Sequence, residues 1–211
     1  MPKDFVNLLA DLKEDEVLKL TKQRLAAKED PMKIMEDARK SMGIVGKRFA
    51  DGEYFLPELV FSGELLKEIN EIVKPYLSKS TAKVKKIGKV VIGTVAGDIH
   101  DIGLNIVDFM LDVSGFEVTN LGVDVPAEKF VKAIKDTKAP VLGLSGFLTP
   151  AFDAMKETVE ALEKAGLRKN VKIMIGGGQM DDEVRKYAKA DAFGKDAMAA
   201  VTLSKKWIGV S

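Results

Sequence analysis

The chain has 211 residues, 46% of them hydrophobic, which is enough for one or two domains with a buried core. Its 33 basic and 32 acidic residues nearly cancel, so it lacks the positive surplus that nucleic-acid binding requires. Without cysteine it can form neither disulfides nor zinc–thiolate or iron–sulfur sites, and no apolar stretch reaches the ~20 residues of a membrane helix. We therefore expect a cytoplasmic protein with no nucleic-acid or membrane partner.

The N-terminal third of the chain has the periodicity of helices. Two helical segments are expected near residues 4–12 and 15–27. Asp30 and Pro31 then form a typical helix start, an N-cap followed by proline. The apolar residues after it recur at steps of three and four: Ile34, Ala38, Met42, Val45 and Phe49. Pro57 is expected to open a fourth helix, so we predict a small four-helix bundle.

From Lys89 onward, apolar runs rich in β-branched residues alternate with helical segments. The predicted strands are 90–95, 117–121, 141–144, 171–175 and 192–193. The predicted helices are 104–113, 127–137, 151–165, 181–189 and 196–208. Strands this apolar indicate a parallel sheet covered by helices on both faces. Five such units favour an α/β flavodoxin-like (Rossmann-like) doubly wound fold.

The two parts are joined by a polar, lysine-rich segment from Ser78 to Gly88 that has no apolar period. This composition is typical of a linker. We therefore divide the chain into a helical domain, residues 1–86, and an α/β domain, residues 87–211.

Three of the predicted strands are followed by glycine-bearing segments. Gly97–Gly103 follows the first strand, Gly143–Pro150 the third and Gly176–Gly178 the fourth. Ligands of doubly wound proteins bind beyond the carboxyl ends of the strands, and glycine there lets a large ligand approach the backbone. Each glycine alone could equally belong to an ordinary turn. The Gly-x-Gly-x-x-Gly pattern of dinucleotide-binding proteins is absent after the first strand.

His100 is the only histidine of the chain, which excludes any site built from two imidazoles. Neutral imidazole is a common ligand for transition metals, and a ligating histidine usually donates its other N–H to a carboxylate. Asp98 or Asp101, on the same loop, could accept that hydrogen bond. A lone histidine without further context is more often structural.

The motifs together resemble the cobalamin-binding signature of methionine synthase, the cobalamin mutases and corrinoid proteins. They are Asp98-x-His100-x-x-Gly103, then after 41 residues Ser145-x-Phe147, then after 28 more Gly176-Gly177. The string from Gly97 to Val107 is similar to the methyltransferase branch, and the string from Val45 to Leu59 is similar to that branch's cap domain, which the mutases lack. The chain is thus identified as resembling a corrinoid protein of cobalamin-dependent methyltransferase systems.

This resemblance implies a role for individual residues. His100 would replace the cofactor's own dimethylbenzimidazole as lower axial ligand of cobalt, with Asp98 holding its distal nitrogen and Asp101 nearby. The displaced nucleotide tail would lie beside the sheet, near Gly103, Ser145, Phe147, Thr149, Gly176 and Gly177. In the helical cap, Phe49, Leu56 and Leu59 would cover the upper face of the corrin ring.

Two residues depart from the methionine synthase pattern. Phe147 stands where leucine is usual and could reshape the channel for the nucleotide tail. Ala151 stands where methionine synthase carries a serine that continues the histidine–aspartate relay. With alanine there, the relay must stop at Asp98 or pass to water.

The resemblance implies a methyl carrier with no complete active site of its own. Its partners would be a donor-specific methyltransferase, a second methyltransferase acting on tetrahydrofolate or a thiol, and a reductive activase. The donor itself (methylamine, methanol, aryl methyl ether or betaine) is not indicated. The alternatives are a cobalamin-dependent sensor or regulator, and a flavodoxin-like domain holding another ligand.

Overall fold

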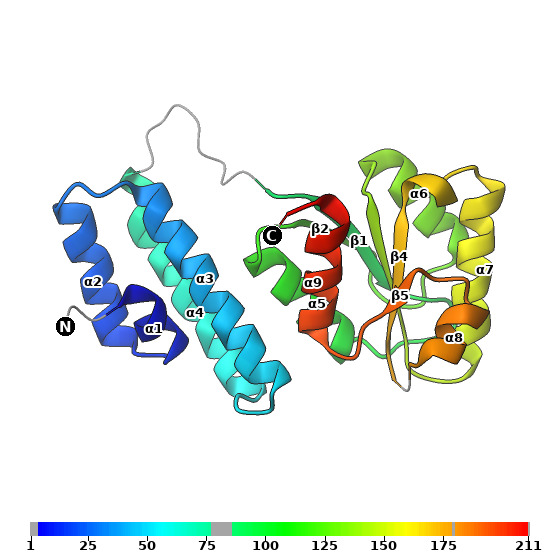
Figure 1. Ribbon diagram of the computed structural model, residues 1–211, viewed down its shortest axis with the longest axis horizontal. Coiled ribbons are helices and arrows are strands. Elements are labelled where there is room, and N and C mark those ends of the chain that lie inside the picture. The colour runs from blue at the N-terminus through cyan, green and yellow to red at the C-terminus, as the bar shows by residue number, and fades with distance from the viewer. Residues whose placement is uncertain (1–3, 77–85, 179, 211) are drawn as a thin grey trace. The chain divides into compact units, whose positions relative to one another are not determined.

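The computed structural model describes residues 4–76, 86–178 and 180–210 (Figure 1). Residue contacts divide the chain into two compact units, Met1–Lys85 and Lys86–Ser211. Most of the predicted linker, residues 78–85, lies outside the described residues. Within the described ranges, no helix combines the length and the apolar composition that crossing a bilayer requires.

The described part of the first unit is helical. Its elements are α1 (Phe5–Ala10), α2 (Glu14–Ala26), α3 (Pro31–Ala50), α4 (Leu56–Val73) and a short 3-10 helix, η1 (Lys74–Tyr76). One apolar core joins the α-helices, and Leu9, Ile34 and Ile69 are fully buried in it. The four helices predicted from the apolar periodicity are confirmed.

Local sequence explains where the two long helices begin. An oxygen of Asp30 accepts a hydrogen bond from the backbone N–H of Met32 at 2.9 Å, and Pro31 occupies the first turn of α3. At the start of α4, the carboxylate of Glu58 accepts a hydrogen bond from the backbone N–H of Phe55 at 2.9 Å. Both contacts satisfy backbone donors that the first helical turn leaves without partners.

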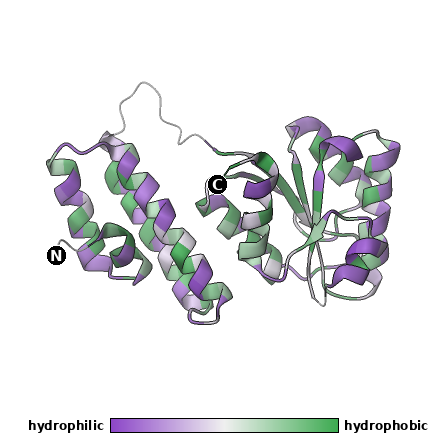
Figure 2. Cartoon of the chain, viewed as in Figure 1, coloured by the Kyte–Doolittle hydropathy of each residue, from purple (hydrophilic) through white to green (hydrophobic). Residues whose placement is uncertain are grey.

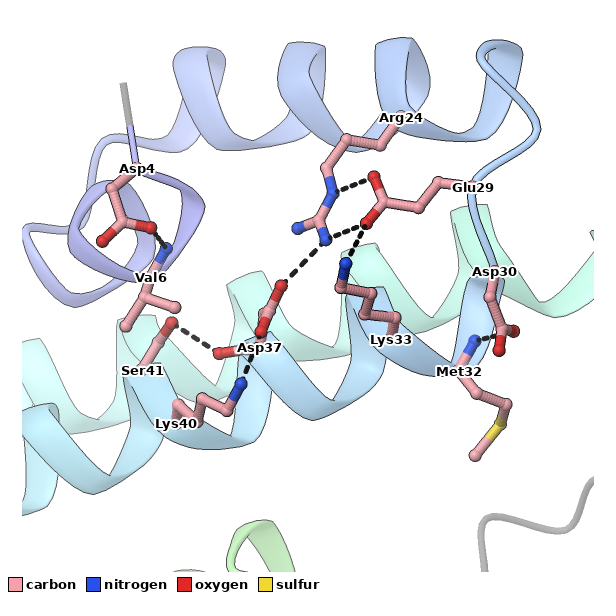
Figure 3. Close-up of polar contacts among 10 residues, drawn as sticks. All are labelled: Asp4, Val6, Arg24, Glu29, Asp30, Met32, Lys33, Asp37, Lys40 and Ser41. Carbon is pink, nitrogen blue, oxygen red and sulfur yellow. Dashed lines mark hydrogen bonds and ion pairs between the residues drawn. The ribbon is translucent and has the colours of Figure 1, made fainter. Parts of the chain in front are cut away.

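A charged cluster ties α2 to α3 (Figure 3). Nη2 of Arg24 lies 2.7 Å from Oε1 of Glu29 and 2.8 Å from Oδ2 of Asp37, and the Arg24 side chain is only 13% exposed. Its guanidinium carbon also lies 5.0 Å from the ring centre of Phe5 in α1. The hydrogen bond from Arg24 lowers the pKa of Glu29. Burial raises the pKa of Asp37, but hydrogen bonds from Lys40 and Arg24 outweigh burial and lower it.

The described part of the second unit contains a sheet of five parallel strands in the order β2-β1-β3-β4-β5. The strands are β1 (Lys89–Thr94), β2 (Glu117–Asn120), β3 (Val141–Gly146), β4 (Lys172–Gly177) and β5 (Ala192–Phe193). This order is that of flavodoxin-like proteins. The predicted doubly wound fold is therefore confirmed.

Helices cover both faces of this sheet (Figure 1). On one face lie α5 (Ile102–Val113) and α9 (Ala197–Ile208). On the other lie α6 (Ala127–Thr137), α7 (Pro150–Lys164) and α8 (Asp182–Tyr187), while η2 (Arg168–Asn170) follows α7. Figure 2 shows hydrophobic strands and helices with hydrophilic outer faces, as expected for a sheet buried on both sides. Val91, Leu142 and Ile173 are fully buried there.

The carboxyl ends of β1, β3 and β4 meet at one edge, because these strands are neighbours and parallel. The strand register sets Thr94 beside Ser145, and Ser145 beside Gly176. The next pair, Gly146 and Gly177, approach so closely that a Cβ on Gly177 would lie 2.1 Å from the carbonyl oxygen of Gly146. Gly177 also has a φ of +124°, so the fold itself requires glycine there.

Candidate functional site

The loop between β1 and α5, residues 95–101, carries Asp98 and His100. Asp98 is buried with 2% of its surface exposed, whereas 49% of the His100 side chain is exposed. The buried hydroxyl of Thr94, at the end of β1, donates a hydrogen bond to the carbonyl oxygen of His100 at 3.4 Å. The loop thus holds a carboxylate inside the protein and an imidazole at its surface.

Asp98 contacts His100 twice. Its Oδ1 atom lies 2.7 Å from Nδ1 of the ring and accepts a hydrogen bond from the backbone N–H of His100 at 2.9 Å. Because an ionised carboxylate only accepts hydrogen bonds, we assign the proton of the neutral ring to Nδ1 and the lone pair to Nε2. In the described part of the chain no hydrogen bond involves Nε2. Nε2 of the ring is therefore available as a metal ligand.

The second oxygen of Asp98 faces the loop between β3 and α7. It accepts hydrogen bonds from the backbone N–H groups of Phe147 at 2.6 Å and Leu148 at 3.4 Å. Burial alone would raise the pKa of Asp98, but the hydrogen bonds from Phe147 and His100 outweigh it and lower the pKa to about 2. Asp98 is thus ionised at neutral pH. The relay ends at these backbone amides. Ala151, whose N–H donates to the carbonyl oxygen of Leu148, is buried and has no polar group in its side chain.

Phe147 also touches the imidazole through its side chain. The two ring centres are 4.7 Å apart and the planes are inclined by 34°. His100 is therefore held from two strands: the loop after β1 carries it, and the loop after β3 supplies both the ring contact and the amides that hold Asp98.

Large apolar side chains are exposed around this loop. We call them the apolar rim: Ile99, Ile102, Val123, Phe147 and Leu148, which are between 39% and 72% exposed. They come from the segments that follow β1, β2 and β3, at the edge where His100 lies. A cluster of exposed apolar side chains of this kind marks a surface that binds a ligand or partner. The sequence singled out only Phe147 among them.

The remaining predicted residues of this unit lie near the carboxyl ends of the strands. Oδ2 of Asp101 accepts a hydrogen bond from Asn105 at 3.2 Å, so Asp98 rather than Asp101 holds the imidazole. A Cβ added at Gly103, in the first turn of α5, would meet no atom within 4 Å. Thr149 is exposed immediately before α7, and Ser145 is half-buried at the end of β3. A Cβ at Gly103 would thus point into open space, whereas the sheet requires glycine at position 177. The roles of these residues toward a ligand stay predictions.

The three apolar residues singled out in the helical unit differ in exposure. Leu56 is exposed, Phe49 is half-buried and Leu59 is buried. Phe55 and Val60, which the sequence did not single out, are exposed beside Leu56 at the start of α4. Their role toward a ligand stays a prediction.

The donor set around His100 suits a metal that brings ligands of its own. Among residues 4–76, 86–178 and 180–210, no group of three or more His, Cys, Asp or Glu side chains could hold a metal ion. A metal bound through His100 must take its other ligands from elsewhere, as a macrocycle supplies them to haem iron. A flat macrocycle would also cover part of the apolar rim. The residues present therefore fit a corrinoid.

Comparison with known proteins leads to the same cofactor. Residues 88–202 match a family model described as a B12 binding domain, and residues 2–74 match a second model with the same description. Trimethylamine corrinoid protein 1 of Methanosarcina acetivorans is 34% identical over 195 residues, covering 92% of this chain and 90% of that protein. The chain belongs to the B12-binding corrinoid proteins.

Solved structures similar to this corrinoid protein agree. A cobalamin-binding protein from Desulfitobacterium hafniense is 36% identical, with a TM-score of 0.81 and coverage of 96% of each chain. The methanol:cobalamin methyltransferase complex of Methanosarcina barkeri is similar with a TM-score of 0.80 and 28% identity, covering 99% of this chain and 79% of that chain. The predicted cobalamin cofactor and methyltransferase setting are confirmed, and the comparisons give no support to a sensor or regulator.

Proposed function

We propose that this corrinoid protein binds cobalamin with the nucleotide base displaced and His100 as the lower axial ligand of cobalt. In this form it carries a methyl group from a donor-specific methyltransferase to a second methyltransferase acting on tetrahydrofolate or a thiol. The observation that carries the proposal is the 2.7 Å contact between Oδ1 of the buried Asp98 and Nδ1 of the half-exposed His100.

The contribution of Asp98 follows from this geometry. Its hydrogen bond fixes the tautomer in which Nε2 has the lone pair, and it raises the basicity of the ring. The backbone amides of Phe147 and Leu148 keep the carboxylate in place, and the Phe147 ring restricts rotation of the imidazole. When bound, cobalamin supplies a cobalt ion that accepts and releases a methyl group. The protein supplies orientation of the ligand and shielding from water.

The apolar rim supports the binding of the corrin ring itself. Its side chains are exposed to water in this structure, at a cost of roughly 25 cal/mol for each Å² of apolar surface that a ligand could cover. A flat ring above His100 would cover apolar surface of Ile99, Phe147 and Leu148. The apolar rim would thus contribute to the affinity for the corrin ring, while ligation by His100 would set the orientation of the ring.

The displaced nucleotide tail would lie at the ends of β3 and β4. Ser145 and Gly176 are neighbours in the sheet register there, and the nearest atom to a Cβ on Gly176 would be 3.7 Å away. Gly103 and Thr149 lie at the starts of the helices that follow β1 and β3. We assign the hydroxyl of Ser145 to a hydrogen bond with the tail.

The family match of the helical unit supports a role for it in cofactor binding. Residues 2–74 match a model described as a B12 binding domain, although they contain no candidate metal ligand of the His100 kind. We propose that Phe49, Leu56 and Leu59 protect the upper face of the corrin. Among these, Leu56 is the exposed side chain.

The chain is proposed to work only with partner enzymes. A similar solved structure is a methanol:cobalamin methyltransferase complex, which supports a methyltransferase as partner. The names of a relative and of a similar complex, which specify trimethylamine and methanol, support a small methylated donor. A reductive activase would be needed to recover cobalt that has lost an electron.

The uniqueness of His100 allows a direct test of the ligand. The protein is produced with nitrogen-15 histidine, loaded with cobalamin, reduced to the cobalt(II) form and examined by electron paramagnetic resonance. Because the chain has one histidine, the label enters one imidazole only. The nitrogen splitting on cobalt should change with the label. An unchanged splitting would mean that the ligand is the cofactor's own base, which refutes the proposal.

A further inference from the structure

The loop that carries His100 is flanked by two others. In the sheet, β1 lies between β2 and β3, so the loops that follow β2 and β3 border the loop after β1 on either side. The β3 side supplies Phe147 and Leu148, whose amides hold the carboxylate of Asp98. The β2 side supplies Asp124, a residue to which neither the sequence nor the comparisons give a role.

Asp124 is bonded to the His100 loop in both directions. The backbone N–H of Gly97 donates to Oδ1 of Asp124 at 2.8 Å, and the backbone N–H of Asp124 donates to the carbonyl oxygen of Asp98 at 2.9 Å. The backbone next to Asp124 is anchored too, because the N–H of Val125 donates to the carbonyl of Thr94 at 3.0 Å. Asp124 therefore lies next to a residue that is bonded to β1, and it holds Gly97 and Asp98 within the loop.

The backbone at Gly97 and at Asp124 is specialised. Gly97 has a φ of +78° and Asp124 a φ of +51°, both in the left-handed region. Glycine adopts this conformation freely, and aspartate and asparagine adopt it more readily than other residues. Both residue types therefore fit their conformations.

We infer that Asp124 is a positioning residue for the cobalt ligand. It holds the backbone of Gly97 and Asp98, while the amides of the β3 loop hold the carboxylate of Asp98. With both ends of Asp98 held, its Oδ1 stays at Nδ1 of His100 and the ring keeps one orientation. The inference rests on the proposed ligation of cobalt by His100, which it deepens.

Two substitutions separate the hydrogen bond from the backbone conformation. Asp124→Gly removes the acceptor and adopts a positive φ without strain. Asp124→Asn keeps an acceptor oxygen and tolerates the same φ, but removes the charge. Lys138→Gly is the matched control, since Lys138 also has a positive φ of 55° and caps α6 at its C-terminus, away from the His100 loop.

The readout is the imidazole splitting on cobalt(II) in the protein labelled with nitrogen-15 histidine, together with amide hydrogen exchange at Gly97 in the cofactor-free protein. In Asp124→Gly we expect the ratio of molecules without imidazole ligation to those with it to rise roughly 2- to 12-fold, the effect of losing one hydrogen bond. Exchange at Gly97 should rise by a similar factor. Asp124→Asn and Lys138→Gly should both stay close to wild type.

The outcomes distinguish this inference from the proposal beneath it. Imidazole splitting in wild type that persists unchanged in Asp124→Gly overturns the role of Asp124 and leaves ligation by His100 intact. Equal losses in Asp124→Asn and Asp124→Gly also overturn it, because the acceptor oxygen would then be irrelevant. Wild-type protein without imidazole splitting overturns both the ligation and this inference.

Discussion

Oδ1 of the buried Asp98 lies 2.7 Å from Nδ1 of the half-exposed His100, while the other oxygen of the same carboxylate accepts the backbone N–H of Phe147. One side chain thus connects the imidazole to a loop 49 residues further along the chain. The orientation of the ring consequently depends on the relative position of β1 and β3. Substitutions on either strand that move the ring should therefore change the nitrogen splitting on cobalt(II).

Replacing Asp98 with asparagine should weaken ligation although the two side chains have the same shape. The carboxylate accepts hydrogen bonds on both sides, from His100 and from Phe147 and Leu148. An amide can accept on only one side, so one set of N–H donors loses its partner in either orientation. We expect imidazole ligation to weaken about 10- to 100-fold. The cofactor-free protein should lose about 1–3 kcal/mol of unfolding free energy.

The measurements for Asp98→Asn are the cobalt(II) resonance spectrum and urea denaturation. Asp101→Asn is a matched control, because Asp101 is exposed on the same loop and its carboxylate accepts a hydrogen bond from Asn105. It should change neither quantity by more than a small factor. Wild-type imidazole splitting in Asp98→Asn would contradict the orienting role of the carboxylate.

Phe147→Leu restores the side chain that is usual in methionine synthase and removes the ring contact with His100. The backbone N–H that holds Asp98 remains, so the carboxylate should keep its place. Aromatic ring pairs contribute about 0.5–1.5 kcal/mol beyond their buried area. Loss of the contact should therefore weaken ligation, and with it cobalamin affinity, roughly 2- to 12-fold. Titration of the cofactor-free protein with cobalamin measures this change.

The control for Phe147→Leu is Phe152→Leu, on α7, since the structure places the Phe147 ring and not that of Phe152 against His100. Cobalamin affinity should be the same in Phe152→Leu and wild type. If both variants lost affinity equally, the effect would come from packing of the β3–α7 region and not from the ring contact.

Sequence periodicity was sufficient for the fold because the elements are strongly patterned. The helix over 127–137 and the strand at 192–193 begin and end at the predicted residues. The order of the strands follows from the rules for parallel sheets, once five alternating units are recognised. Differences occur at the ends of elements, as for β3, which continues to Gly146 instead of ending at Leu144.

The candidate site was predictable only in part. Motif spacing singled out Asp98 and His100, but the choice between Asp98 and Asp101 depends on the direction of the backbone after β1. The amides of Phe147 and Leu148 have no side-chain signature, and Asp124 is joined to the loop only by the tertiary structure. Exposure is equally a tertiary property. Ile99 and Ile102 are apolar in sequence but stand at the surface.

The charged cluster of the helical unit should stabilise the protein only above the acid range. In the folded chain the pKa values of Glu29 and Asp37 lie below their usual values of 4.5 and 3.8. Their stabilising contribution is therefore complete above those usual values and is lost as the pH falls through the lower folded values. Arg24→Met removes both ion pairs (Figure 3) and leaves Asp37 partly buried beside Lys40.

We expect Arg24→Met to lose about 1–3 kcal/mol of unfolding free energy near neutral pH, and less as the pH approaches about 3. Urea denaturation followed by the helix signal of the full chain measures both. Lys132→Met is the control, because the Lys132–Asp136 pair on α6 is exposed on both sides and should contribute less than about 1 kcal/mol. A loss in Arg24→Met that is the same at all pH values would contradict the electrostatic origin.

Gly103 and Gly177 should respond oppositely to the same substitution, because one leaves space for a ligand and the other is required by the sheet. A Cβ at Gly177 would lie 2.1 Å from the carbonyl oxygen of Gly146, and its φ of +124° excludes alanine. Gly177→Ala should therefore lower the free energy of unfolding of the cofactor-free protein by about 3 kcal/mol or more.

At Gly103 a Cβ would meet no atom within 4 Å, and the residue is helical. Gly103→Ala should leave the free energy of unfolding unchanged or raise it by up to about 1 kcal/mol, because alanine favours the helix. It should lower cobalamin affinity on the order of tenfold, since a methyl group that overlaps the ligand costs about 1–3 kcal/mol. Thermal unfolding without cofactor and cobalamin titration together measure the pair. Gly103→Ala protein with wild-type affinity would show that the start of α5 does not contact the cofactor.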